Sequence, residues 1–235
     1  MNTTPVGNEL YNSNTIGKWN DGTAKTVTTF DDRFPQPFKN GKGFEMHASG
    51  NPRLKLEGNG IATLEADAGH GRVYIDSVNY KAITEYELRF NDENIDNHTN
   101  QTQSRHQASD PPENRFGGVS HMIDRKTKTC GTKLEKYHNV HIDGPEASLP
   151  KPIAVGQWIK VRNTDIPDEA AKTISIKMEI DFGSGYEKVL EHKFTGLETY
   201  MVDETTFKKI SYTWWRVNCT KTGSISLRNI RQTAL

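Results

Sequence analysis

Cysteine, long apolar runs and an excess of charge of one sign are all scarce in this sequence of 235 residues. The 30 Lys and Arg residues balance 30 Asp and Glu residues, and no basic block is present. Nucleic-acid-binding proteins usually carry clustered Lys and Arg residues on one face. Because this chain has no such cluster in its sequence, we expect no nucleic-acid partner. No apolar stretch approaches the ~18 residues that a membrane-spanning helix needs, so we expect no membrane span.

With only two cysteines, Cys130 and Cys219, the sequence does not identify a redox compartment. A disulfide and two free thiols are equally compatible with it. The first residues, Met1-Asn-Thr-Thr-Pro, do not form a signal peptide, and we interpret the sequence as the mature form of an extracellular or cell-surface protein. Four glycosylation sequons are present, although such tripeptides often arise by chance; they begin at Asn2, Asn97, Asn100 and Asn218.

Motifs of several enzyme classes are also missing. The sequence has no His-Glu-x-x-His, no Gly-x-Ser-x-Gly, no P-loop and no dinucleotide fingerprint. We therefore expect no required cofactor and no metal at the site. The sequence has no 12-residue calcium-binding loop either. Asp181 and the segment Asn91-Asp-Glu-Asn94 do supply oxygen ligands, so a structural Ca²⁺ stays an open alternative.

What the sequence does contain is strict alternation of apolar and polar residues. Between residues 173 and 182 every even position is apolar, whereas the odd positions from Ser175 to Asp181 are polar or charged. The segment Glu85-Tyr-Glu-Leu-Arg-Phe90 follows the same rule. A period of two is typical of strands that bury one face and leave the other in solvent.

Many such segments follow one another with little helical periodicity between them, and only residues 168–172 offer a short turn of helix. This pattern predicts an all-β fold, a two-sheet antiparallel β-sandwich. We expect residues 1–25 to form an N-terminal extension and residues 26–235 to form a single domain. Polar stretches at 91–100 and 108–114 and the proline-containing segment 142–152 are predicted as loops. Strands are expected at 26–30, 43–47, 53–57, 61–66, 72–76, 83–90, 103–107, 116–123, 132–141, 157–163, 173–182, 187–194, 212–217 and 224–230.

Several fragments, in this order, resemble concanavalin A-like jelly rolls, the lectin and glucanase sandwich. They include Gly69-His-Gly-Arg-Val-Tyr-Ile75, Gly117-Gly-Val-Ser-His121, Gly156-Gln-Trp-Ile-Lys160 and the closing Ser224-Ile-Ser-Leu-Arg-Asn-Ile230. Within that group the chain looks most like polysaccharide lyases of the alginate and glucuronan type. The resemblance covers most of the chain from about residue 25.

The resemblance rests on three strand motifs of those lyases. Glu87-Leu-Arg89 matches the end of an Arg-x-Glu-Leu-Arg strand, and His121 matches the histidine of a Gln-Ile-His strand. Lys133 or Lys136, together with Tyr137, matches a strand that carries lysine and tyrosine. The chain departs from the motifs where Glu85 replaces the first arginine and Val119 replaces the glutamine.

The resemblance implies a secreted lyase that cleaves a uronic-acid glycan by β-elimination. Tyr137 and His121 would move the protons, and Arg89 or Arg105 would neutralise the carboxylate. We expect an acidic polysaccharide as partner and a monomeric protein. The predicted catalytic residues are His121, Tyr137 and Arg89, and the predicted substrate-binding residues are Arg105, His106, Gln107, Lys133 and Glu87.

Other interpretations stay open. His121 lies on the same strand face as Val119 and Ile123, which is equally typical of a core histidine, and the charged residues can simply be solvated ion pairs. The same fold also serves non-catalytic carbohydrate-binding or surface proteins. Glycoside hydrolases are a third class, but Glu179-Ile-Asp181 begins their carboxylate motif without the second glutamate.

Overall fold

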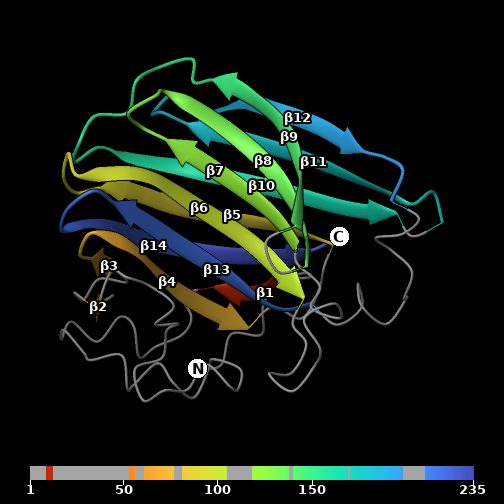
Figure 1. Ribbon diagram of the computed structural model, residues 1–235, viewed down its shortest axis with the longest axis horizontal. Helices are drawn as coiled ribbons and strands as arrows, with labels where there is room; N and C mark the ends of the chain where they lie inside the picture. The colour runs from red at the N-terminus through yellow and green to blue at the C-terminus, as the bar shows by residue number, and fades with distance from the viewer. Residues whose placement is uncertain are drawn as a thin grey trace.

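The computed structural model describes residues 9–12, 53–56, 61–76, 81–104, 118–137, 140–168, 170–197 and 210–235. These residues form two antiparallel sheets that pack face to face, and no helix occurs among them (Figure 1). The predicted all-β, two-sheet sandwich is therefore confirmed.

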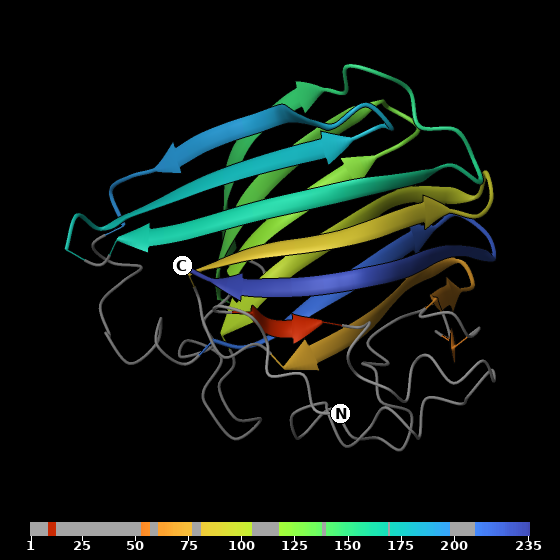
Figure 2. The same cartoon turned by 180° about the vertical axis from the view of Figure 1, so that it is seen from behind.

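The eight-stranded sheet has the strand order β12-β11-β10-β5-β14-β3-β2, and β1 pairs with β14 outside that path. Figure 2 shows this sheet toward the viewer. Its strands are β1 (Glu9–Asn12), β2 (Arg53–Leu56), β3 (Ala62–Ala66), β5 (Ala82–Phe90), β10 (Trp158–Asp168), β11 (Thr173–Asp181), β12 (Tyr186–Phe194) and β14 (Gly223–Ala234).

The six-stranded sheet has the order β4-β13-β6-β7-β8-β9. Neighbours along the chain pair from β6 to β9, whereas β13 returns from near the C-terminus to lie between β4 and β6. Its strands are β4 (Gly69–Asp76), β6 (Ile95–Ser104), β7 (Gly118–Asp124), β8 (Thr129–Tyr137), β9 (Val140–Ser148) and β13 (Ile210–Cys219).

The core lies between the sheets and is built by alternation. On β11, Ile174, Ile176, Met178 and Ile180 are buried, as their spacing predicts. Leu88 and Phe90 on β5 and Trp215 on β13 are fully buried in the same core. On β11 and β5 one face thus packs in the core and the other carries mainly polar and charged residues. We call the face of the eight-stranded sheet that points away from the six-stranded sheet its outer face.

Two predicted loops prove to be strands. Residues 95–100 belong to β6, although they were predicted as a polar loop. His98 and Asn100 of β6 face the core, so a polar sequence conceals a buried strand. Residues 142–148 belong to β9, which is an edge strand of the six-stranded sheet. Proline is tolerated there because an edge strand has a neighbour on one side only, so the missing N–H of Pro145 can face away from that neighbour. The expected helical turn is a plain turn at residues 170–172.

The two cysteines do not form a disulfide. Cys130 lies on β8 and Cys219 on β13, and both are free and buried. Strands β6 and β7 separate them in the sheet, which places them three strand spacings apart. At ~4.8 Å per strand that is about 14 Å, far beyond the Cα separation that a disulfide spans. The alternative of two free thiols is therefore the one that the structure adopts.

Candidate functional site

The outer face of the eight-stranded sheet carries charges that alternate in sign from strand to strand. In one row Lys160 of β10 lies between Asp181 of β11 and Glu87 of β5, and Arg228 of β14 follows. Lys160 Nζ lies 3.1 Å from Asp181 Oδ2, and Arg228 Nε donates to Glu87 Oε2 over 2.7 Å. Opposite charges on directly opposed residues stabilise a sheet, so this row holds the strands in register.

A second row runs parallel to the first, two residues away on β11, β10 and β5 and three residues away on β14. It contains Glu179 of β11, Arg162 of β10, Glu85 of β5 and Arg231 of β14. Arg162 Nε donates to Glu85 Oε1 over 2.8 Å, and its guanidinium lies 3.8 Å from the ring centre of Tyr186. Arg162 is thus fixed by a carboxylate and an aromatic ring together.

A β-bulge in β14 adds a side chain to this face. Between Arg228 and Arg231, β14 uses one residue more than β5 does between Glu87 and Glu85. Asn229 takes the left-handed conformation there, with φ of 52°, which asparagine tolerates better than most residues. The exposed Asn229 then donates from Nδ2 to Glu87 Oε1 over 2.6 Å, so the bulge holds Glu87 with two consecutive residues.

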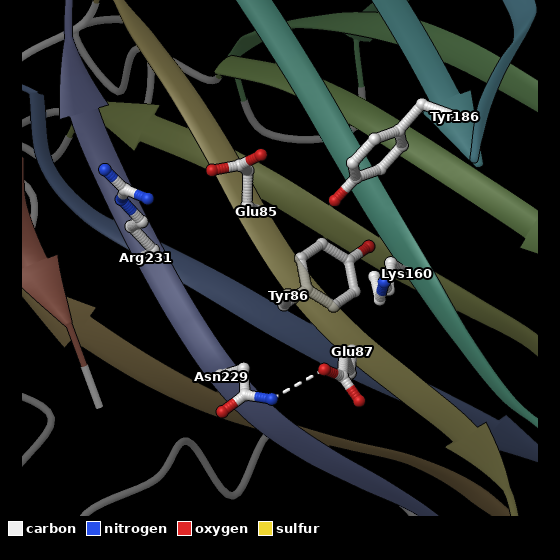
Figure 3. A pocket seen from close by; sticks show the side chains of 7 residues that line it. All are labelled: Glu85, Tyr86, Glu87, Lys160, Tyr186, Asn229 and Arg231. Carbon is white, nitrogen blue, oxygen red and sulfur yellow. Dashed lines mark hydrogen bonds between the residues drawn. The ribbon is translucent and has the colours of Figure 1, made fainter. Parts of the chain in front are cut away.

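These features enclose a shallow pocket of about 230 Å³ (Figure 3). Its lining side chains come from four strands, and the bond between Asn229 and Glu87 crosses one side of it. Tyr86 is 2% exposed and belongs mainly to the core. The lining residues are Glu85, Tyr86, Glu87, Lys160, Tyr186, Asn229 and Arg231.

The electrostatics of the pocket are set by these pairs. Burial opposes the charge of Arg162, but the hydrogen bond and charge of Glu85 raise its pKa on balance. Burial, and then the charge of Glu85, raises the pKa of the Tyr186 hydroxyl, so that hydroxyl keeps its proton. The backbone N–H groups of Gly183 and Gly185 and the Lys160 ammonium lower the pKa of Asp181 to about 2. Tyr186 therefore contributes a neutral phenol to the pocket, and Asp181, the ionised partner of Lys160, lies outside its lining.

Trp158 of β10 lies at the next position along this face, beside Arg89 of β5. The guanidinium carbon of Arg89 lies 4.7 Å from the Trp158 ring centre, and that of Arg228 lies 4.1 Å from it. Two cations thus converge on one indole ring. Arg89 also donates to Asn91 Oδ1 over 2.8 Å and to Ser226 Oγ over 3.1 Å.

The predicted site residues fall in different places. Glu87 lines the pocket and Arg89 lies next to it, on the outer face of the eight-stranded sheet. His121 lies instead between the two sheets, where it is 1% exposed, and its Nε2 is 2.7 Å from Asp165 Oδ1 of β10. The structure thus does not bring His121 and Arg89 to one cleft.

His121 belongs to a series of polar pairs that join the sheets across the core. The Tyr86 hydroxyl lies 3.0 Å from His98 Nε2, and Asn163 Nδ2 donates to Asn100 Oδ1 over 2.9 Å. His98 Nδ1 must carry a hydrogen, because its partner 3.0 Å away is the carbonyl oxygen of Arg216. Burial lowers the pKa of His98 to about 3, so the ring is neutral and Nε2 carries no hydrogen. The Tyr86 hydroxyl is therefore the donor to Nε2.

Lys133 lies on the other side of the six-stranded sheet, 3.8 Å from Asp143 of β9. The neighbouring Leu134 is fully buried, so Lys133 is on the wet face of β8, as its strand pattern predicts. The backbone of Tyr137 ends β8, but its side chain lies outside the described part of the chain. Arg105, His106 and Gln107 lie outside the described residues altogether.

Of the lining residues, only Glu87 was predicted as a site residue from the sequence. The six that were not predicted are Glu85, Tyr86, Lys160, Tyr186, Asn229 and Arg231. Alternation along β10 would have placed Lys160 on the outer face. The position of Asn229 depends on the bulge, for which Arg-Asn-Ile gives no clear signal. Within the described residues, no group of three or more His, Cys, Asp or Glu is arranged to hold a metal. Nor does the described chain contain a helix that is long and apolar enough to cross a membrane.

The arrangement of strands defines a lectin-like β-sandwich, and comparisons with solved structures agree. A protein reported with endo-acting O-glycanases of the human gut microbiota superposes with a TM-score of 0.60 at 12% sequence identity. The superposition covers 97% of this chain and 100% of that protein. A Bacillus subtilis protein of unknown function with a galectin-like fold gives a TM-score of 0.55 at 12% sequence identity, and the superposition covers 97% of this chain and 96% of that protein. The carbohydrate-binding module CBM66 of Bacillus subtilis gives a TM-score of 0.52 at 12% sequence identity, and the superposition covers 82% of this chain and 96% of that module.

These likenesses concern the fold, since the sequence identities are low. No family model and no curated protein sequence matches the chain.

Proposed function

We propose that this protein binds carbohydrate in the pocket on the outer face of the eight-stranded sheet. The observation that carries the proposal is the pocket itself, where carboxylates, an amide and a phenol converge from four strands. Sugar hydroxyls both donate and accept hydrogen bonds, so a sugar site needs donors and acceptors side by side. Glu85 and Glu87 accept, Tyr186 donates, and the amide of Asn229 can do both.

The pocket is also pre-formed. Glu87 is held by Arg228 and Asn229, and Asp181 holds Lys160, so these side chains lose little freedom when a ligand arrives. The ring of Tyr186 forms one wall, and aromatic rings suit the C–H faces of pyranoses. The name of CBM66 and the glycanase description of the gut protein support a glycan ligand by analogy of fold.

The variant Asn229→Gly tests this proposal. Glycine accepts positive φ, so the bulge should persist while the amide that reaches Glu87 is lost. The matched control is Lys128→Gly, which replaces another exposed residue with positive φ, in the turn between β7 and β8. On a glycan array and then by calorimetry, we expect Asn229→Gly to weaken binding by about fivefold to tenfold, the scale of one hydrogen bond, and the control to leave it unchanged. Equal affinity of both variants, or no glycan bound by the wild type, would refute the site.

The finer proposal is an extracellular, monomeric lyase that cleaves an acidic glycan by β-elimination. The position of Arg89 beside the pocket supports it, because a guanidinium can neutralise a uronate carboxylate. Incubation with alginate or glucuronan tests it directly. A lyase releases unsaturated sugars with ultraviolet absorbance, whereas a glycoside hydrolase releases reducing ends without it. Binding with neither product would leave a carbohydrate-binding protein.

A further inference from the structure

Four polar side chains form a closed square in the core between the two sheets. Asn163 and Asp165 lie two residues apart on β10, in the eight-stranded sheet. Asn100 of β6 and His121 of β7 lie directly opposite each other in the six-stranded sheet. Asn163 Nδ2 donates to Asn100 Oδ1 over 2.9 Å, and Asp165 Oδ1 lies 2.7 Å from His121 Nε2. None of the four residues is more than 3% exposed, so the square is closed to bulk solvent.

Two opposite corners of this square each carry a polar atom without a partner. The side chain of Asn163 is hydrogen-bonded to Asn100 and to the Tyr86 hydroxyl, but its Oδ1 accepts no hydrogen bond within the described chain. His121 uses Nε2 for Asp165, and its Nδ1 is likewise without a partner. Burying a polar atom without a hydrogen bond costs free energy, and such atoms are rare in folded proteins. Two of them in one small cluster indicate a ligand that lies between them.

The indole of Trp215 adds a third such atom to the same layer of the core. Trp215 lies on β13 directly opposite Asn100, and its ring meets that of Tyr86 edge to face, with 5.7 Å between the ring centres. The side chain is fully buried, and its Nε1 has no hydrogen-bond partner in the part of the chain that the structure describes. The unpartnered atoms thus come from both sheets: Asn163 from one, His121 and Trp215 from the other.

The chemistry of the three atoms selects the class of ligand. Asn163 Oδ1 can only accept a hydrogen bond and Trp215 Nε1 can only donate one, so the ligand must do both. His121 Nδ1 accepts when Nε2 carries the hydrogen that points at Asp165 and the ring is neutral. A metal cation would face the hydrogen of the indole, and an anion would lie beside the Asp165 carboxylate, so neither charge suits the site. Water is the smallest neutral molecule that offers two donors and an acceptor.

We propose that the core binds one ordered water molecule, which donates to Asn163 Oδ1 and His121 Nδ1 and accepts from Trp215 Nε1. About three hydrogen bonds are typical of a water buried in a protein. This water connects β10 of the eight-stranded sheet to β7 and β13 of the six-stranded sheet, so it links the sheets as the direct polar pairs do. It is a structural ligand of the sandwich, separate from the pocket on the outer face and from any glycan.

Nuclear magnetic resonance of the full, ¹⁵N-labelled chain tests the site through its indole N–H groups. The chain has 4 tryptophans, and Trp215→Phe identifies the signal of Trp215 by its loss. Magnetisation is transferred from water in the laboratory frame and in the rotating frame. A water held longer than the protein tumbles gives cross-peaks of opposite sign in the two spectra, whereas hydrogen exchange gives the same sign. We expect opposite signs for Trp215. Trp158 on the outer face is the control, because surface water leaves too quickly to give this pattern.

A crystal structure at a resolution that shows water molecules is the second measurement, and it decides the question alone if Trp215→Phe does not fold. We expect one water within hydrogen-bonding distance of Asn163 Oδ1, His121 Nδ1 and Trp215 Nε1. Cross-peaks of the same sign for Trp215, or no cross-peak, would overturn the proposal. So would a crystal structure in which the three atoms bond protein groups or pack without a water. Neither measurement depends on whether the outer pocket binds a glycan.

Discussion

Arg89 and His121 show how far single residues could be assigned from the sequence. The alternation of residues 85–90 predicted that Arg89 would share a face with Glu87, and it does. The apolar neighbours of His121 on its strand face were typical of a core position, and His121 is buried. Its partner, Asp165, lies 44 residues along the chain on the other sheet, and no local pattern could pair them.

The two thiols should be inert in the native protein. Burial is the main factor that raises the pKa of Cys130 to about 11 and that of Cys219 to about 12. Since the thiolate is the reactive form, neither should react quickly with a thiol reagent at pH 8. In denaturant without reductant both should react at once. No reactive thiol in the unfolded, unreduced protein would mean that the two cysteines are bridged.

At the scale of strands, periodicity succeeds where one face is apolar and fails where the core is polar. Strand β11 has an unbroken apolar face and was predicted almost to its ends. Strand β6 contains no apolar residue after Ile95, and its buried side chains are satisfied by partners on β5, β10 and β13. That satisfaction depends on the tertiary structure, so the sequence alone indicated a loop.

Gly144 marks a close approach between the edge strands of the two sheets. A Cβ built at Gly144 would lie 2.8 Å from Phe194 Cζ on β12 and 2.9 Å from the backbone oxygen of Thr132 on β8. Backbone cannot move away cheaply, so Gly144→Ala should lower the free energy of unfolding by roughly 1–3 kcal/mol. Gly131→Ala is the control, because its Cβ would meet no atom closer than 3.7 Å. Chemical denaturation measures both, and a similar small effect in the two variants would contradict the close packing.

On the scale of the whole molecule, the neutral His98 ties stability to pH. Burial lowers its folded-state pKa from 6.5 to about 3. Between these two values the unfolded chain binds a proton at this residue and the folded protein does not. The contribution of neutral His98 is therefore complete above pH 6.5 and is lost progressively as the pH falls toward 3.

The variant His98→Gln should isolate this effect, because glutamine does not titrate. Free energies of unfolding measured from pH 7 to pH 4 should fall less steeply for the variant than for the wild type. The difference in slope should approach ~1.4 kcal/mol per pH unit, the value for one proton. Identical slopes would mean that unfolding does not change the protonation of His98 in this pH range.

The fold was predictable as a whole because strands such as β5 and β11 carry a clear two-residue period. The pocket was not predictable, because it exists only when β5, β10, β12 and β14 come together in one sheet. Glu87 and Asn229 are 142 residues apart in the chain, and they are in contact because of a bulge for which the sequence gives no clear signal. Sequence patterns could name the face that carries the site, but they could not name the residues that meet there.

The bulge in β14 has a genetic consequence. Asn229 is the extra residue: without it, Arg228, Ile230 and Arg231 would stand opposite Glu87, Tyr86 and Glu85 in plain alternation. Ile230 would still face the core and both arginines would still face outward. Loss or gain of a single codon could therefore erase or create one wall of the pocket while the strand keeps its orientation. Among related genes, a one-residue length difference at this point would be a marker of changed ligand preference.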